Sequence, residues 1–88
     1  MLRQKKFNPI DEIQYEVLAY LEQHPDAADS AEAIQRWWLL ERLARISRIE
    51  VDDALQQLVD QQLLDKRVLN DGRNIYCRRR PQTAVKTN

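Results

Sequence analysis

The sequence predicts an α+β domain that is mainly helical and that ends in a two-stranded β-hairpin. Hydrophobic residues recur at helical spacing in three segments, within residues 9–23, 30–44 and 48–63. Two short segments that favour extended structure, 66–69 and 74–77, flank a turn signal. The chain has 88 residues, which is enough for one small domain but not for two.

Composition excludes several classes of protein. Hydrophobic residues make up 43 % of the chain and charged residues 32 %, as in ordinary globular domains. The single cysteine, Cys77, excludes an internal disulfide. No hydrophobic run is long enough to cross a bilayer, and residues 1–6 lack the hydrophobic stretch of a secretory signal. We therefore expect a cytoplasmic protein with no membrane partner.

The net charge is zero, but the charges are unevenly distributed. Residues 1–10 carry three basic residues and no acidic one. Residues 11–65 carry thirteen acidic residues against four arginines, and residues 66–88 carry seven basic residues against one aspartate. This asymmetry indicates a directed electrostatic surface or, equally well, a charged hairpin and tail that only keep the domain soluble.

The first helix has clear boundary signals. Residues 1–8 show no periodicity, so we expect a flexible basic arm there. Pro9 suits the first helical turn, with Asn8 as the N-cap. Pro25 disfavours helical geometry in the residue before it, so the helix should end near Gln23. The core-facing residues would be Ile10, Ile13, Val17, Leu18 and Leu21, with Tyr15 and Tyr20 beside them.

A second helix is expected to begin at Asp29-Ser30-Ala31-Glu32, a capping-box pattern with Asp29 as the cap. Two ends are compatible with the sequence: near Ala44, or near Trp38 with residues 43–46 extended. We favour the longer helix, because good helix formers follow and no glycine or proline intervenes. Adjacent helical residues point about 100° apart. We therefore expect Trp37 in the core, and Trp38 either buried or exposed as a contact for a partner.

The third helix and the hairpin form the best-defined unit of the chain. Ser47 and Glu50 form a capping box at the start of the helix. Its core-facing residues would be Val51, Ala54, Leu55, Leu58, Val59 and Leu63. The turn contains Gly72, the only glycine of the chain, where the backbone most needs one. Cys77 should share a face of the second strand with Ile75. Residues 81–88 are expected to form a disordered tail.

These elements, over residues 9–80, resemble a winged helix-turn-helix domain of the kind found in small bacterial proteins. The residues that carry the resemblance are Ser47, Val51, Leu55, Leu58, Leu63, Leu64, Arg67, Asp71, Gly72, Arg73 and Tyr76, together with the segment 29–39. The resemblance implies that the third helix is the recognition helix and that the hairpin is the wing. Two positions depart from it: Gln62 stands where glycine is frequent, and the turn before Ser47 is either too long or has Arg45 at a glycine position.

The resemblance implies a DNA-binding domain like those of transcription regulators, with double-stranded DNA as the partner. The expected nucleic-acid contacts are Lys66, Arg67, Arg73, Arg78, Arg79 and Arg80 of the wing, Arg48, Gln56 and Gln57 of the helix, and Arg3, Lys5 and Lys6 of the arm. The helix itself suits DNA poorly. It carries four carboxylates against Arg48 on the surface that should approach a polyanion, and these oppose non-specific affinity. Contact should therefore depend mainly on the wing and the arm.

The alternative is a protein–protein interaction module of the same fold. The residues that would contact the partner are Trp38, Asp52, Asp53 and Asp60. We expect no enzyme, cofactor or metal, because no nucleophile–base pair, ligand cluster or phosphate-binding loop is visible. The only conceivable pair, Cys77 and His24, lies on separate elements with nothing to orient it. The expected oligomeric state is a monomer or a weak homodimer.

Overall fold

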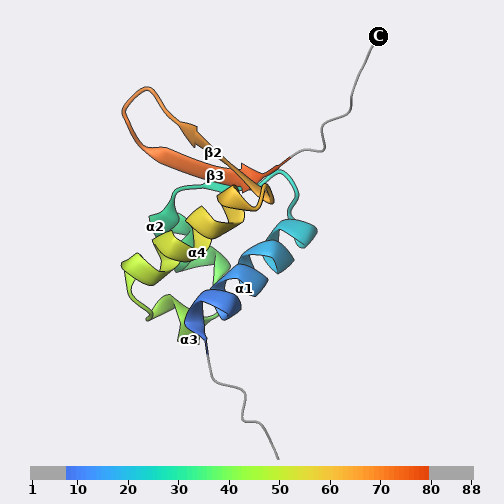
Figure 1. Cartoon of the computed structure of the whole chain (residues 1–88), viewed down its shortest axis with the longest axis vertical. Coiled ribbons are helices and arrows are strands. Elements are labelled where there is room, and N and C mark those ends of the chain that lie inside the picture. The colour runs from blue at the N-terminus through green and yellow to red at the C-terminus, as the bar shows by residue number, and fades with distance from the viewer. Residues whose placement is uncertain (1–7, 80–88) are drawn as a thin grey trace, which may run out of the picture.

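The computed structural model describes residues 8–79, so the predictions for the basic arm, Arg80 and the tail lie outside the described residues. The helices are α1 (Pro9–Gln23), α2 (Ala31–Ala33), the π-helix η1 (Ile34–Trp38), α3 (Glu41–Ala44) and α4 (Arg48–Asp60). The strands are β1 (Ala28–Asp29), β2 (Leu64–Val68) and β3 (Asn74–Arg78). The helices gather together, and the β2–β3 hairpin extends away from them (Figure 1). The predicted α+β, mainly helical class is confirmed.

The sheet contains one strand more than predicted. It is antiparallel with the order β1-β3-β2, so β3 is central. In β1, Ala28 pairs with Cys77 and Asp29 with Tyr76. A strand of two residues has no periodicity of its own, and it forms here because β3 offers it a partner. This pairing joins the segment after α1 to the hairpin.

The hydrophobic core lies between α1, α4, η1 and the base of the sheet. Its buried members are Ile13, Val17, Leu21, Ile34, Trp38, Leu39, Leu43, Val51, Ala54, Leu55, Leu58, Leu64 and Tyr76. The stripes predicted for the first and third helices supply seven of these residues. α1 and α4 lie side by side, and Asn8 caps α1 by accepting a hydrogen bond from the Ile10 N–H at 3.0 Å. The predicted start and end of α1 are confirmed.

The prediction of one continuous second helix, from residues 29–32 to Ala44, is wrong. Leu39 and Leu40 are extended, with ψ angles of 151° and 153°, and they separate η1 from α3. In one continuous helix Ile34 and Leu43, nine positions apart, would point about 180° away from each other. Both are fully buried in the structure, so the break allows both to face the core. The alternative end near Trp38 is correct, but residues 43 and 44 are helical rather than extended.

The two tryptophans are placed differently from the prediction. Trp37 is 69 % exposed, so its expected place in the core is wrong, whereas Trp38 is 5 % exposed. The Trp38 Nε1 donates a hydrogen bond to the Oδ2 of Asp29 at 2.8 Å. Asp29 is therefore not the helix cap; Ser30 is, and its Oγ accepts from the Ala33 N–H at 3.2 Å. Because Trp38 is buried, it is not available as a contact residue for a partner.

α4 begins as predicted and ends earlier than predicted. The Ser47 Oγ accepts a hydrogen bond from the Glu50 N–H at 3.3 Å. The Glu50 carboxylate accepts from the Ser47 hydroxyl at 3.4 Å, and not from the Ser47 backbone N–H as the capping box predicted. The helix ends at Asp60, and Gln62 then adopts a left-handed conformation with φ of 66°. That reversal leaves Leu63 44 % exposed instead of in the helical stripe. At the hairpin turn Gly72 has φ of 90°, the geometry for which its position was singled out.

Candidate interaction surface

A groove of about 550 Å³ lies between the start of α2, the exposed face of α4 and the hairpin. Its lining residues are Ser30, Ala31, Glu32, Arg48, Asp52, Asp53, Gln56, Lys66, Arg73, Asn74 and Tyr76. The positions on α4 follow one another at helical spacing, which places them on one face. The hairpin projects beyond the helices and forms the other wall (Figure 1). The groove therefore unites residues from both predicted binding sets, for DNA and for a protein.

Each basic residue of the groove is held by a neighbouring side chain, whereas two of its three acidic residues, Asp52 and Asp53, are not held in this way within the described part of the chain. Within residues 8–79, neither Asp52 nor Asp53 forms an ion pair. Arg73, by contrast, holds the Oδ2 of Asp71 at 2.8 Å, and its backbone N–H donates to the Oδ1 at 3.0 Å. These bonds, the backbone one first, lower the pKa of the Asp71 carboxyl below its usual value. Arg73 is thus already engaged with an acid of its own turn.

Lys66 is also engaged within the groove. Its Nζ donates to the Oε1 of Gln56 at 3.1 Å and lies 5.9 Å from the ring centre of Tyr76, a cation–π arrangement. Gln56 in turn donates through its Nε2 to the Oδ1 of Asp60 at 3.0 Å. The chain of contacts from Asp60 to Lys66 ties the hairpin to α4. Lys66 therefore fixes the hairpin against the helix as well as contributing charge.

Tyr76 closes the base of the groove. It is 5 % exposed and points to the helical side of the sheet. Burial raises the pKa of the Tyr76 hydroxyl above its ordinary value, and the negative charge of Asp52 raises it further. The phenol is therefore protonated at neutral pH. It adds a neutral polar group beneath the carboxylates of α4.

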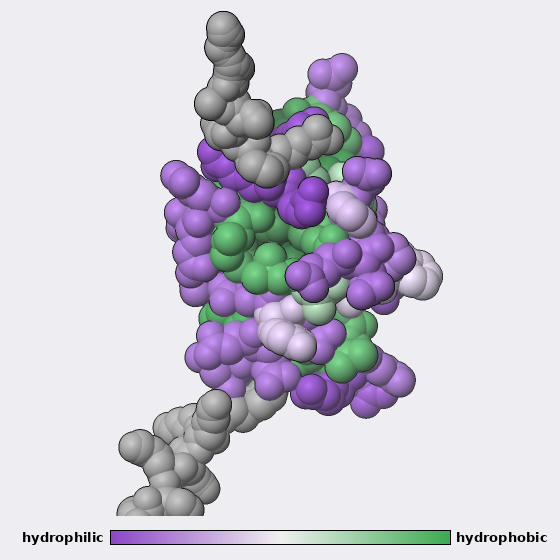
Figure 2. Space-filling view, turned by 90° about the vertical axis from the view of Figure 1, so that its right-hand side faces the viewer, coloured by the Kyte–Doolittle hydropathy of each residue, from purple (hydrophilic) through white to green (hydrophobic). Residues whose placement is uncertain are grey.

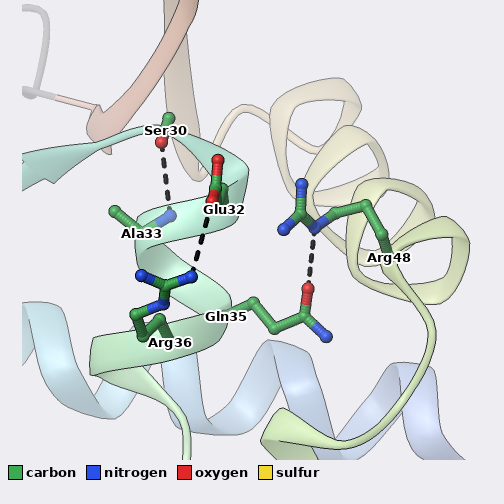
Figure 3. A network of polar contacts seen from close by, with 6 residues as sticks. All are labelled: Ser30, Glu32, Ala33, Gln35, Arg36 and Arg48. Carbon is green, nitrogen blue, oxygen red and sulfur yellow. Dashed lines mark hydrogen bonds and ion pairs between the residues drawn. The ribbon is translucent and has the colours of Figure 1, made fainter.

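Gln35 was not singled out from the sequence, yet it organises the start of α4. Its Oε1 accepts from the Arg48 Nε at 2.7 Å (Figure 3). Its Nε2 donates to the carbonyl oxygens of Ala44 at 3.1 Å and Ile46 at 2.5 Å. One amide thus holds the α3–α4 turn and orients Arg48 beside the groove. The hydrophobic periodicity of the sequence could not identify Gln35. Its partners come close to it only because the chain breaks after η1 and turns back.

The remaining basic residues of the hairpin lie elsewhere. Arg67 and Arg78 border a separate depression formed with residues 25–28 and Cys77. Arg79 approaches the Oδ1 of Asp65 at 3.9 Å. The predicted wing cations are therefore divided between two surfaces, with Lys66 and Arg73 in the groove and Arg67 and Arg78 outside it.

Gln57 does not belong to the groove either. Its Oε1 accepts from the Nε2 of Gln14 at 3.3 Å, and the same Nε2 donates to the Ala54 carbonyl at 3.2 Å. Gln57 therefore faces α1. Ile49, which was not predicted to have a role, is 73 % exposed at the start of α4. It falls outside the hydrophobic stripe of that helix, a signal that was present in the sequence.

Residues 8–79 contain no cluster of three or more side chains suited to hold a metal ion. Within the same part of the chain, no helix has both the length and the hydrophobicity required to cross a membrane. Comparison of the chain with protein-family models, curated proteins and solved structures found no match. The chemistry of the surface therefore has to support any functional conclusion.

Proposed function

We propose that the chain is a winged-helix domain that acts as a protein-interaction module, with the groove between α2, α4 and the hairpin as its binding surface. The winged-helix assignment is supported by α4 followed directly by an antiparallel hairpin, and by the helices packed against the base of that hairpin. α4 takes the place of the recognition helix, and the hairpin takes that of the wing.

The observation that carries the choice of partner is the state of the charges in the groove. Among the side chains of residues 8–79, Asp52 and Asp53 have neither an ion-pair nor a hydrogen-bond partner. The basic residues of the groove are all engaged: Arg48 with Gln35, Lys66 with Gln56 and Arg73 with Asp71. A phosphate backbone brought to α4 would meet these carboxylates, and the electrostatic term that supplies non-specific DNA affinity would be unfavourable. A protein segment that carries Lys or Arg would instead complete the pairs.

The rest of the groove suits a protein segment with both polar and hydrophobic groups. Gln56 and Asn74 offer amide donors and acceptors. Ile49 does not line the groove, but it is exposed one helical turn before Asp52 and Asp53 and offers a hydrophobic contact beside it. The contacts of Lys66 and Gln35 hold both walls in place. A surface that is already ordered loses less entropy on binding.

Site-specific photo-crosslinking tests this proposal. A photoreactive residue at Asp53, in the groove, is compared with one at Asp11, which is exposed on α1. We expect a discrete protein adduct from cells of the source organism at position 53 and none at position 11. The purified partner should then bind the wild type and lose at least roughly tenfold in affinity with Asp52→Asn/Asp53→Asn. Equal binding by that variant would refute the groove as the binding surface.

DNA binding is the second candidate, and one observation favours it. Arg67 and Arg78 are exposed and form no ion pair within residues 8–79, so both are available for phosphates. Titration with random-sequence duplex at low salt separates the two functions. If DNA is the partner, the wild type binds and Arg67→Ala/Arg78→Ala does not. If the groove binds a protein instead, the wild type binds the duplex weakly and Arg67→Ala/Arg78→Ala binds it no less well.

A further inference from the structure

A second depression, about 480 Å³ in volume, lies between α1, the turn after α4 and the end of β3. We call it the α1 hollow. Its lining residues are Tyr15, Leu18, Ala19, Leu21, Glu22, Gln62, Leu63, Arg78 and Arg79. On the face seen in Figure 2, hydrophobic side chains gather in a hollow bordered by hydrophilic ones. None of the residues of the α1 hollow lines the groove between α2, α4 and the hairpin.

The α1 hollow exposes large hydrophobic side chains. Tyr15 is 70 % exposed and Leu63 44 % exposed, and Leu18 is only partly covered. Leu63 is at the surface because the left-handed Gln62 turns the chain out of α4. Hydrophobic surface rimmed by polar residues is typical of protein interaction sites. The hollow therefore has the composition of an interface.

The charges around the α1 hollow have opposite signs. Glu22 lies at one border, and Arg78 and Arg79 lie at another. Neither Glu22 nor Arg78 forms an ion pair within residues 8–79. A two-fold interface needs a surface that is complementary to itself, because each patch meets a copy of the same patch. A protruding aromatic, a hydrophobic depression and one unpaired charge of each sign meet that condition.

We propose that the α1 hollow binds a second copy of this chain and forms a two-fold homodimer. Tyr15 of each copy enters the depression beside Leu63 of the other, and Glu22 faces the partner's Arg78. The α1 hollow and the groove share no lining residue, so the dimer contacts proposed here use none of the groove residues. The dimer would then present two binding surfaces to a partner and gain affinity through avidity if both sites can be reached at once. The dimer itself does not depend on what the groove binds.

Sedimentation velocity over a series of protein concentrations tests the dimer. We expect the wild type to shift reversibly from monomer to dimer as concentration rises. Tyr15→Ser and Leu63→Lys should raise the dissociation constant by roughly tenfold or more, because each removes hydrophobic contact at the centre of the interface. Trp37→Ser is the control, since Trp37 is equally exposed but lies outside the hollow. A wild type that stays monomeric at every concentration, or an equal effect of the control, would overturn the proposal.

A charge exchange tests the two-fold geometry itself. Glu22→Lys alone and Arg78→Glu alone should each dissociate the dimer, since like charges then meet at both pairs. Mixing the two variants should restore a heterodimer, because each pair is again of opposite sign. Circular dichroism of each variant confirms that it is folded. Failure of the mixture to associate, with both variants folded, would refute this arrangement of the copies.

Discussion

Trp38 donates its indole N–H to Asp29 over 2.8 Å, and its ring stacks on Tyr20 with the centroids 4.5 Å apart. This single side chain joins η1 to β1 and to α1. Its polar atom is satisfied in a buried position, which explains how the second of two adjacent tryptophans enters the core. The bond also fixes the residue of β1 that pairs with Tyr76.

Removing the acceptor of this bond should destabilise the fold. Asp29→Ala leaves the Trp38 N–H buried without a partner, so we expect a loss of about 1–3 kcal/mol in the free energy of unfolding. Asp29→Asn keeps an acceptor oxygen and should lose less. Urea denaturation measures the effect, and Asp26→Ala, at an exposed neighbouring position, is the control. An Asp29→Ala protein as stable as the control would show that the bond does not contribute.

The Gln35 amide should stabilise the turn before α4. Gln35→Ala removes its bonds to Arg48, Ala44 and Ile46, and we expect a loss of about 1–2 kcal/mol on unfolding. Arg36→Ala, the neighbouring position, loses only an exposed pair with Glu32 and should change stability by less than about 0.5 kcal/mol. Thermal unfolding of the two variants gives the comparison. Equal melting temperatures would contradict the assigned role.

Replacement of Gln62 with glycine should stabilise the fold. Its φ of 66° lies in the left-handed region, which costs an ordinary residue about 1 kcal/mol and glycine almost nothing. We expect Gln62→Gly to gain up to about 1 kcal/mol, measured by denaturant unfolding. Gln61→Gly is the matched control, because Gln61 has φ of −83° and glycine there only adds freedom to the unfolded chain. A loss at both positions would contradict this account.

The free energy of unfolding should decrease at alkaline pH as the hydroxyl of Tyr76 loses its proton. The pKa of its hydroxyl is raised by burial and by Asp52, so the folded state holds this proton more tightly than the unfolded state. The resulting stabilisation is complete below about pH 10, the unfolded pKa, and is lost as pH rises through the folded value. Tyr76→Phe should flatten this part of the curve of melting temperature against pH.

The contribution of Asp52 to this effect can be separated from that of burial. Asp52→Asn removes the negative charge and should lower the pKa of Tyr76, followed by NMR of labelled tyrosine. Asp60→Asn serves as the control, because Asp60 is not among the groups that raise this pKa. A pKa unmoved by Asp52→Asn would leave burial as its only cause.

The sequence predicted the elements whose signals are local. The caps at Asn8 and Ser47, the stripe of α1 and the turn at Gly72 all depend on residues close together in the chain, and the structure confirms them. The hairpin register follows from the same turn, with Val68 opposite Asn74. Local hydrogen bonds and backbone preferences are sufficient to define such features.

The wrong predictions concern segments whose structure is determined by contacts with residues distant in the sequence. The break after Trp38 exists because the core needs both Ile34 and Leu43, and β1 exists because β3 lies beside it. The helix propensities of the residues near Trp38 did not indicate the break, and the two residues of β1 show no pattern that would predict a strand. For the surface, the sequence identified the acids of α4 and the basic hairpin. It did not indicate that Arg67 and Lys66, adjacent in the chain, lie on different surfaces, although strand alternation permits it.

The central position of β3 has a consequence for synthesis. Both of its neighbours in the sheet, β1 and β2, precede it in the chain, and neither pairs with the other. On the ribosome the two earlier strands therefore remain without their hydrogen-bonding partner until β3 emerges. The sheet can then form only at a late stage, with β1 closing a loop of nearly fifty residues. Until that moment the nascent helices have no sheet to pack against, so we expect residues 8–79 to complete their fold only after β3 has left the exit tunnel.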